Sequence, residues 1–332
     1  MRHVKKILLL STGGTIASVP SEEGLVPRFT GQDLVNLVPQ LKGVCRIDCK
    51  SILSLDSSNM QPEDWKLIAR ETYSGLQEYD GIVITHGTDT MAYTSSMLSF
   101  MLRNLQKPVI LTGSQLPIDD PNTDGKRNIL HSFQAASEGI PGVYIVFDGE
   151  IIRGTRASKL RTKSFHAFES INMPAIGFIK DGEVVIQHCP VFPDGEFTLE
   201  DAVDNRVFLL KLIPGTMPQI LDMLIKMDYK GLVIESFGSG GLPYAGRDLL
   251  SAINRVLEAG IIVVVSTQCL YEGADLTIYD VGVKAARAGV VSGHDMTTEA
   301  ALTKLMWVLG QARDLKQAKE MMLKEYCGEI SI

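Results

Sequence analysis

The chain has 332 residues and a net charge of −7, with no block of lysine or arginine, which argues against nucleic acid and anionic membranes as main partners. Its 45% hydrophobic and 21% charged residues are typical of a globular protein that buries a large core without disulfides or structural metals. The five cysteines are odd in number and scattered, which indicates reduced thiols, and no Cys/His pair follows Cys45 and Cys49 with zinc-ligand spacing.

The first expected element is a strand over Val4–Leu10. Its apolar run Ile7–Leu10 is too short for the hydrophobic region of a secretory signal peptide, so we expect a cytoplasmic protein. No run in the sequence is long and apolar enough to cross a bilayer, so we expect no membrane partner.

Strand and helix patterns alternate through residues 1–186. This alternation predicts an α/β domain with a mainly parallel sheet and helices on both of its faces. The further strands expected are Ile47–Leu55, Gly81–Thr85, Pro108–Thr112 and Val143–Phe147, and the helices expected between them are Thr30–Val38, Pro62–Leu76, Ala92–Leu105 and Lys126–Ser137.

Residues 187–205 interrupt the alternation with two prolines, a glycine and five acidic residues, and we interpret them as a linker. A second, smaller parallel α/β domain is expected over 206–332. Its strands are predicted at Val207–Leu212, Leu232–Ile234 and Ile261–Ser266, and its helices at Met217–Lys226, Gly246–Ala259, Thr297–Leu309 and Leu315–Glu325.

Polar clusters follow the expected strands of the first domain. Because the carboxyl ends of parallel strands lie at one edge of the sheet, these clusters are expected to converge there. They are Ser11–Thr15, Asp56–Asn59, His86–Thr90, Gly113–Gln115 and Arg153–Lys159.

The cluster TGGT at 12–15 invites a comparison with phosphate-binding loops. It lacks the lysine of G-x-x-x-x-G-K-[ST], and it lacks the spacing of G-x-G-x-x-G. A generic anion site at a glycine-rich turn stays open, but no nucleotide or other cofactor is expected.

The same clusters suit a hydroxyl nucleophile. A lysine oriented by a carboxylate can serve as the base in place of histidine, so Thr88, Lys159 and Asp89 form a possible relay, with Thr15 as a second threonine facing the same point. Ser57 and Ser58 could hold the carboxylate of a zwitterionic ligand, with Asp89 on its ammonium.

Each of these residues also has an ordinary structural interpretation. Singly, the threonines and serines are most often helix caps or turn residues, Asp89 could cap the next helix, and a lone lysine is usually solvated. His86 could simply form a hydrogen bond within its loop, and the other histidines show no metal-ligand spacing.

Longer motifs carry a resemblance to a known family. TGGTIAS at 12–18, HGTDTMAYT at 86–94 and KPVILTGSQLP at 107–117 closely resemble the L-asparaginase family of bacterial type. The resemblance runs over essentially the whole chain, including RGTRASK at 153–159 and GHDMTTEAALTKL at 293–305, and it is closest to the cytosolic type I branch.

The resemblance implies cofactor-free hydrolysis of L-asparagine to L-aspartate and ammonia in a homodimer or homotetramer. By motif, Thr15 is the nucleophile, and Thr88, Asp89 and Lys159 form the second triad. Ser57 matches the serine that holds the substrate carboxylate, whereas Ser58 stands where many relatives have glutamine.

The resemblance departs from the family pattern in the loop 19–30, which we expect to act as a lid. Many relatives place a tyrosine there against the nucleophile, and this chain has Leu25. We therefore predict that Tyr279, in LTIYDVG, supplies the phenol from the C-terminal domain, through a subunit interface.

Three other functions are compatible with parts of this pattern. A glutaminase-asparaginase of mixed specificity would use the same groups, because one methylene changes selectivity by only about 1–3 kcal/mol. A tRNA-dependent amidotransferase subunit is expected to carry a further domain before the TGGT strand, where this chain has eleven residues. A non-catalytic asparagine sensor would not need Thr15, Thr88, Asp89 and Lys159 together.

Overall fold

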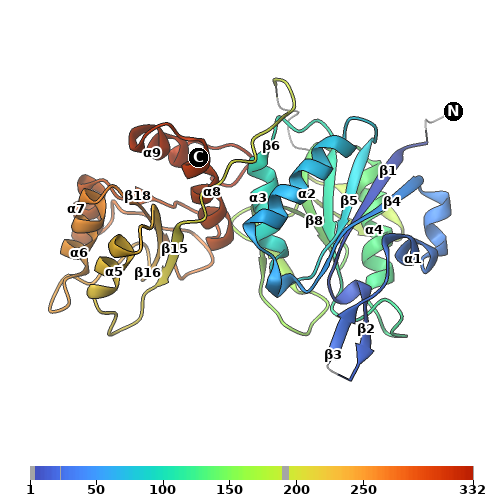
Figure 1. Cartoon of the computed structure of the whole chain (residues 1–332), viewed down its shortest axis with the longest axis horizontal. Helices are drawn as coiled ribbons and strands as arrows, with labels where there is room; N and C mark the ends of the chain where they lie inside the picture. Colours follow the sequence, from blue (N-terminus) through green and yellow to red (C-terminus); the bar gives the residue numbers. More distant parts are fainter. Residues whose placement is uncertain (1–3, 23, 189–193, 332) are drawn as a thin grey trace. The chain divides into compact units, whose positions relative to one another are not determined.

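The structure is a computed structural model that describes residues 4–22, 24–188 and 194–331. It divides into an N-terminal unit, up to Asp201, and a C-terminal unit from Ala202 onward. The predicted α/β class with two domains is confirmed (Figure 1). Across the described ranges, no helix is long and apolar enough to cross a membrane.

The N-terminal unit is built on an eight-stranded sheet with the order β13-β12-β9-β8-β7-β5-β1-β4. The strands β4, β1, β5, β7 and β8 run parallel, and β9, β12 and β13 extend one edge antiparallel. The parallel strands are β1 (Lys6–Gly13), β4 (Arg46–Leu55), β5 (Gly81–Thr85), β7 (Pro108–Thr112) and β8 (Gly142–Phe147), and the antiparallel ones are β9 (Glu150–Arg153), β12 (Gly177–Lys180) and β13 (Glu183–Ile186).

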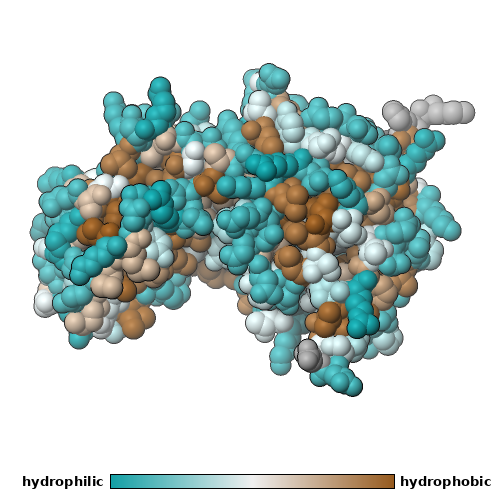
Figure 2. All heavy atoms as spheres, viewed as in Figure 1, coloured by the Kyte–Doolittle hydropathy of each residue, from teal (hydrophilic) through white to brown (hydrophobic). Residues whose placement is uncertain are grey.

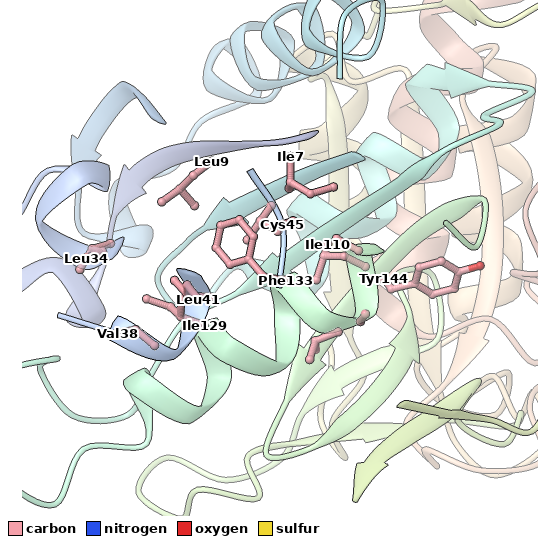
Figure 3. Close-up of a cluster of buried hydrophobic side chains, with 14 of the residues drawn as sticks. Ile7, Leu9, Leu34, Val38, Leu41, Cys45, Ile110, Ile129, Phe133 and Tyr144 are labelled. Carbon is pink, nitrogen blue, oxygen red and sulfur yellow. The ribbon is translucent and has the colours of Figure 1, made fainter. Parts of the chain in front are cut away.

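Helices cover both faces of this sheet, as the alternation predicted. Helices α1 (Gly31–Asn36) and α4 (Gly125–Ser137) pack on one face, where Ile7, Leu9 and Phe133 lie in a buried apolar cluster (Figure 3). Helices α2 (Pro62–Gly75) and α3 (Met91–Met101) cover the other, and Gly75 of α2 lies against side chains from β1 and β5. Successive β1 residues alternate between the two faces, so both faces of the strand are apolar.

Smaller pairs of strands complete the N-terminal unit. After β1 come a short helix η1 (Thr15–Ala17) and a hairpin of β2 (Ser18–Ser21) and β3 (Gly24–Pro27). The strands β10 (Ala157–Lys159) and β11 (Phe168–Ser170) pair antiparallel, as do β6 (Leu102–Arg103) and β14 (Thr198–Leu199). The last of these falls within the predicted linker, of which residues 189–193 lie outside the described part of the chain.

The C-terminal unit has a four-stranded parallel sheet in the order β15-β16-β17-β18. Helices α5, α6 and α7 pack on one face, and α8 and α9 on the other. The strands are β15 (Val207–Lys211), β16 (Gly231–Ser236), β17 (Ile262–Thr267) and β18 (Val291–Ser292); the helices are α5 (Gln219–Lys226), α6 (Leu249–Glu258), α7 (Asp280–Ala288), α8 (Thr298–Gln311) and α9 (Leu315–Leu323).

Four of the five cysteines lie in the described part of the chain. Cys45 is buried in the core cluster of the N-terminal unit, Cys49 is half-buried, and both are unpaired. Burial raises the pKa of each thiol to about 11, so neither is a thiolate at neutral pH. Cys269 and Cys327 form no disulfide with any described residue, and Cys189 lies outside the described residues.

Candidate functional site

The candidate site lies where the order of the parallel strands changes direction. From β1 the chain goes to β4 on one side, and it then returns to β5 on the other side. Such a switch point leaves a crevice at the carboxyl ends of the two central strands, where ligands bind in open α/β sheets. The hydroxyl of Thr12 donates a 2.8 Å hydrogen bond to the carbonyl of Thr85, which joins the ends of β1 and β5.

The first loop at this edge carries Thr15. Gly14 has φ of 80°, in the left-handed region that favours glycine, and a Cβ there would overlap the backbone of Gly87. Because Gly14 and Gly87 have no side chains, the loop after β1 can contact the loop after β5. Thr15 begins η1 and is half-buried, and its hydroxyl makes no hydrogen bond with any residue described by the structure.

The second loop carries Ser57 at the start of the short helix η3 (Ser57–Asn59). Ser57 is only 3% exposed, and its hydroxyl oxygen accepts a 3.2 Å hydrogen bond from the backbone N–H of Asp89. Its carbonyl accepts a 2.8 Å bond from the hydroxyl of Thr90. The loops after β4 and β5 are thus tied together through Ser57.

The third loop brings the predicted relay together. The ammonium Nζ of Lys159, on β10, lies 2.7 Å from Oγ1 of Thr88 and 2.6 Å from Oδ1 of Asp89. The lysine side chain is 15% exposed and that of Asp89 is 61% exposed. Within the described part of the chain, the second carboxylate oxygen of Asp89 makes no hydrogen bond, so it is available to a cationic ligand.

Ser58 is placed differently from Ser57. It is exposed, and both its backbone N–H and its hydroxyl donate to Oδ1 of Asp56, at 2.8 and 2.7 Å. These two hydrogen bonds, aided by the nearby charge of Lys159, hold the pKa of Asp56 below its ordinary value. The hydroxyl of Ser58 therefore already donates to an ionised carboxylate.

The structure adds Gln115, which the sequence showed only as part of a polar run at a strand end. The hydroxyl of Thr88 donates a long, 3.4 Å hydrogen bond to Oε1 of Gln115. The amide of Gln115 donates in turn to the carbonyl of Ser164, at 3.0 Å. Gln115 thereby connects Thr88 to the loop between β10 and β11.

A buried carboxylate shapes the loop that carries Gln115. Asp124 accepts hydrogen bonds from the backbone N–H groups of Gln115 and Leu116 and from the side-chain amide of Asn128. Burial raises the pKa of Asp124, although the N–H donors act in the opposite direction. No pattern in the sequence indicated this role, because Asp124 lies in a turn rich in polar residues.

The two residues expected to bear on a lid lie in different units. Leu25 is on β3 and is 49% exposed, and Figure 2 shows apolar side chains on the surface of the β2–β3 hairpin. Tyr279 is the N-cap residue of α7 in the C-terminal unit and is 59% exposed. Its phenol is therefore on the surface of its own unit.

The fold places Thr88, Lys159 and Asp89 together at a sheet edge, beside the loop that carries Thr15, and so defines an α/β protein with a polar candidate site for a small ligand. Two family models match the chain, "Asparaginase, N-terminal" over residues 6–192 and "Glutaminase/Asparaginase C-terminal domain" over residues 206–322. The chain belongs to the asparaginase family.

Curated relatives agree with this membership. An L-asparaginase of Thermococcus kodakarensis is 45% identical over 98% of this chain and 99% of its own length. One of the subunits of the Glutamyl-tRNA(Gln) amidotransferase of Pyrococcus furiosus is 39% identical over 99% of this chain and 78% of its own length.

Solved structures give the same result. The thermostable L-asparaginase from Thermococcus kodakarensis superposes with a TM-score of 0.94 at 45% identity, covering 98% of this chain and 99% of that one. L-asparaginase I from Vibrio cholerae gives a TM-score of 0.88 at 32% identity, covering 99% of this chain and all of that one.

Proposed function

We propose that this protein is a cytoplasmic amidohydrolase that converts L-asparagine and water to L-aspartate and ammonia. The observation that carries the proposal is the placement of Lys159 Nζ within hydrogen-bond distance of both Thr88 and Asp89. Membership in the asparaginase family and the similarity to an L-asparaginase over nearly the whole chain support it. A probable cytoplasmic L-asparaginase from Campylobacter jejuni, 25% identical, supports the location.

The proposed substrate pose follows from the polar groups of the three loops. Asp89 binds the α-ammonium through its free oxygen, while the other oxygen holds Lys159. The hydroxyl of Ser57 donates to the α-carboxylate, and Ser58 has a lesser part because it donates to Asp56. The side-chain amide then points to the threonines.

In the proposed reaction, the Thr15 oxygen attacks the amide carbon and its proton passes to the leaving nitrogen. The C–N bond breaks, ammonia leaves and an ester on Thr15 remains. Water then hydrolyses the ester, which releases aspartate and regenerates the hydroxyl of Thr15. In a direct-displacement variant, water attacks the amide carbon in a single stage. The ammonium of Lys159 gives a proton to the leaving nitrogen, and a proton of the attacking water passes through the hydroxyl of Thr88 to restore the ammonium.

The test is ammonia release from L-asparagine and L-glutamine by the purified protein, with a Thr15→Ala preparation as the control for contaminating enzymes. We expect asparagine to be favoured by about 10–200-fold in kcat/KM, as one methylene allows. Succinamic acid, which lacks the ammonium, should be a poor substrate because it leaves Asp89 unpaired. A ratio of kcat/KM for asparagine to that for glutamine near one would indicate a mixed glutaminase-asparaginase. If neither amide released ammonia, the hydrolase proposal would fail and the hypothesis of a non-catalytic asparagine sensor would remain.

We further propose that Tyr279 contacts the nucleophile, because the hydroxyl of Thr15 has no partner among the described residues and the β2–β3 hairpin contains no tyrosine. Tyr279→Phe should lower kcat by about tenfold or more, as the loss of a positioned proton-transfer group does. Tyr244→Phe, at another highly exposed tyrosine of the same unit, is the matched control. Unchanged turnover of Tyr279→Phe would refute the role.

The same variant tests the proposed homodimer or homotetramer. If Tyr279 serves the site of a neighbouring copy, co-expressed Thr15→Ala and Tyr279→Phe chains form mixed dimers with one complete site. Random pairing then restores about a quarter of the wild-type activity. No recovery, with Tyr279→Phe impaired on its own, would mean that Tyr279 acts within its own chain.

A further inference from the structure

His86 lies directly before the loop that carries Thr88 and Asp89, and its imidazole is fully buried. Its Nδ1 lies 2.7 Å from the carbonyl oxygen of Gly87, and its Nε2 lies 2.9 Å from the hydroxyl of Thr94 on α3. The indole Nε1–H of Trp65, on α2, donates to the same hydroxyl at 3.0 Å. The hydroxyl of Thr94, on α3, therefore connects Trp65 of α2 with His86 next to the site loop.

The chemistry of the partners fixes every proton in this chain of hydrogen bonds. A carbonyl only accepts, so Nδ1 of His86 must carry the proton that binds Gly87. Burial lowers the pKa of His86 to about 4, so the ring is neutral at physiological pH and Nε2 is an acceptor. The hydroxyl of Thr94 then donates to Nε2, and its oxygen accepts from Trp65, which can only donate.

The peptide that His86 holds is central to the site. Gly87 contacts Gly14 of the Thr15 loop, and a Cβ on Gly87 would overlap the side chain of Ser57. The carbonyl of Gly87 belongs to the same planar peptide as the N–H of Thr88, and in a trans peptide the two point in opposite directions. A hydrogen bond from the buried ring to this carbonyl therefore turns the Thr88 N–H away from the interior.

The backbone of His86 is also anchored. Its N–H donates to the carbonyl of Thr112 at the end of β7, at 2.8 Å, and its own carbonyl lies against Gly113. The loop is thus fixed up to His86 by the sheet. Beyond that residue, the next carbonyl depends on the imidazole.

We propose that His86 is a positioning residue of the amide-hydrolysing site: as a neutral donor, supported by Thr94 and Trp65, it sets the orientation of the Gly87–Thr88 peptide. It takes no proton from the substrate. Its effect is on the placement of the Thr88 N–H and hydroxyl relative to Thr15 and the amide. This inference rests on the proposed function, because it concerns the turnover of the same site.

Two amide substitutions separate the two ring nitrogens. In His86→Asn the side-chain amide nitrogen occupies roughly the place of Nδ1 and can still donate to Gly87. In His86→Gln the amide extends to roughly the place of Nε2, so it keeps a bond with Thr94 and loses the one with Gly87. His86→Leu removes both bonds.

We expect kcat for asparagine to fall about 100-fold in His86→Leu and His86→Gln, which is the effect of a displacement of about 1 Å in a site. His86→Asn should recover to within about tenfold of wild type, with KM near the wild-type value in all three. The pH profile of His86→Asn should match that of wild type, since a neutral donor does not titrate near pH 7.

Two helix variants complete the experiment. Thr94→Val should lower kcat less than His86→Leu, because it removes only the support of the ring. Ser99→Ala, on the same helix, is the control, since its buried hydroxyl bonds within α3 to the carbonyl of Ser95. Folding of each variant is checked by circular dichroism and by its thermal midpoint.

The outcomes are distinct from those for the proposed function. Ammonia release by wild type decides that function before any variant is made. With an active wild type, a folded His86→Gln with unchanged kcat would overturn the inference. So would a His86→Asn enzyme as impaired as His86→Leu, or a pH profile in which an inflection near pH 6–7 disappears, which would make His86 an acid or base.

Discussion

Replacing Thr15 by alanine is expected to lower kcat for ammonia release from asparagine by about 10³–10⁵-fold, as loss of a nucleophile does in enzymes that form covalent intermediates. The expected loss falls on kcat more than on KM, because the contacts proposed for Asp89 and Ser57 with the head group of asparagine do not involve Thr15. Thr15 is half-buried at the start of η1, so the smaller side chain should leave the loop intact.

Two variants serve as controls for this experiment: a second substitution of Thr15 itself and a substitution of Ser11 on the preceding strand β1. Thr15→Ser keeps a hydroxyl and should retain activity within about 100-fold, because the nucleophile is present but less constrained. Ser11→Ala removes a buried hydroxyl of β1 that bonds to Ser51, and it should leave turnover unchanged.

The Thr15 variant also decides between the two threonines. Loss of a reacting group lowers kcat by more than about tenfold. If Thr15→Ala retained more than about a tenth of the activity, Thr15 would therefore not be the nucleophile, and the attacking oxygen would belong to Thr88. A trapped ester on Thr15, found by mass spectrometry after rapid acid quench, would instead favour the covalent route over direct displacement.

Much of the sheet could be predicted because its central strands are apolar on both faces. The bounds of β5 and β7 agree with the prediction, since each is a run of five buried residues between turn residues. The strands β9, β12 and β13 were not predicted. They are short and partly exposed, and their antiparallel pairing depends on neighbours distant in the sequence.

Two further elements escaped prediction for local reasons. Helix α7 is short and contains Gly282 and three alanines, so few large apolar side chains mark it in the sequence, and its N-cap residue is the tyrosine proposed for the site. The residues of the expected lid form the β2–β3 hairpin, whose stem residues Arg28 and Phe29 both donate to the carbonyl of Ala17. The glycine and prolines of this segment predicted a loop, so the pairing of β2 with β3 was not predicted.

The convergence of Thr88, Asp89 and Lys159 followed from one rule, that parallel strand ends share an edge. Lys159 nevertheless lies on β10, outside the main sheet, so its distance to Thr88 depended on a segment whose path no sequence pattern indicated. The support from Trp65 and Thr94 was equally hidden. Their positions on α2 and α3 match ordinary core residues. Only the packing of the two helices shows that Trp65 donates to the hydroxyl of Thr94 and that this hydroxyl contacts His86.

A buried ion pair in the C-terminal unit gives the largest expected effect on stability. Lys304 of α8 and Glu329 are both fully buried, with Nζ 2.7 Å from Oε1. The lysine also donates to the carbonyl of Lys324, and the carboxylate accepts from the N–H groups of Tyr326 and Cys327. The pair thus fixes the C-terminal segment on α8.

Lys304→Met is expected to lower the free energy of unfolding of the C-terminal unit by about 3–5 kcal/mol, because it leaves an uncompensated carboxylate in the interior. Urea unfolding measures this loss through the fluorescence of Trp307, with Trp65→Phe removing the signal of the N-terminal unit. Adding Glu329→Gln to Lys304→Met should recover most of the stability, since a neutral amide still accepts from the two N–H groups.

The exposed pair of Lys316 and Glu320 on α9, 3.9 Å apart, provides the matched control. Lys316→Met removes the same charge and nearly the same side chain from the same unit, but solvent screens the pair, so little change is expected. Equal effects of the two lysine substitutions would show that the buried pair has no special part in stability.

The pH dependence of the stability tests the role of the Glu329 charge independently. Burial alone raises the pKa of Glu329, but the charge and hydrogen bond of Lys304 outweigh it and hold the pKa below the ordinary 4.5. A depressed carboxyl pKa stabilises the fold above that ordinary value, and the stabilisation is lost as the pH falls through the folded-state pKa. In Lys304→Met burial is the largest remaining effect, so the pKa of Glu329 lies above 4.5 in the folded variant. The difference in stability between wild type and Lys304→Met should therefore begin to shrink above pH 4.5, where the variant takes up a proton on Glu329, and should go on shrinking until the pH falls through the depressed pKa of wild type. A difference that stayed constant on acidification would mean that lost packing by the lysine stem, and not the charge of Glu329, destabilises the variant.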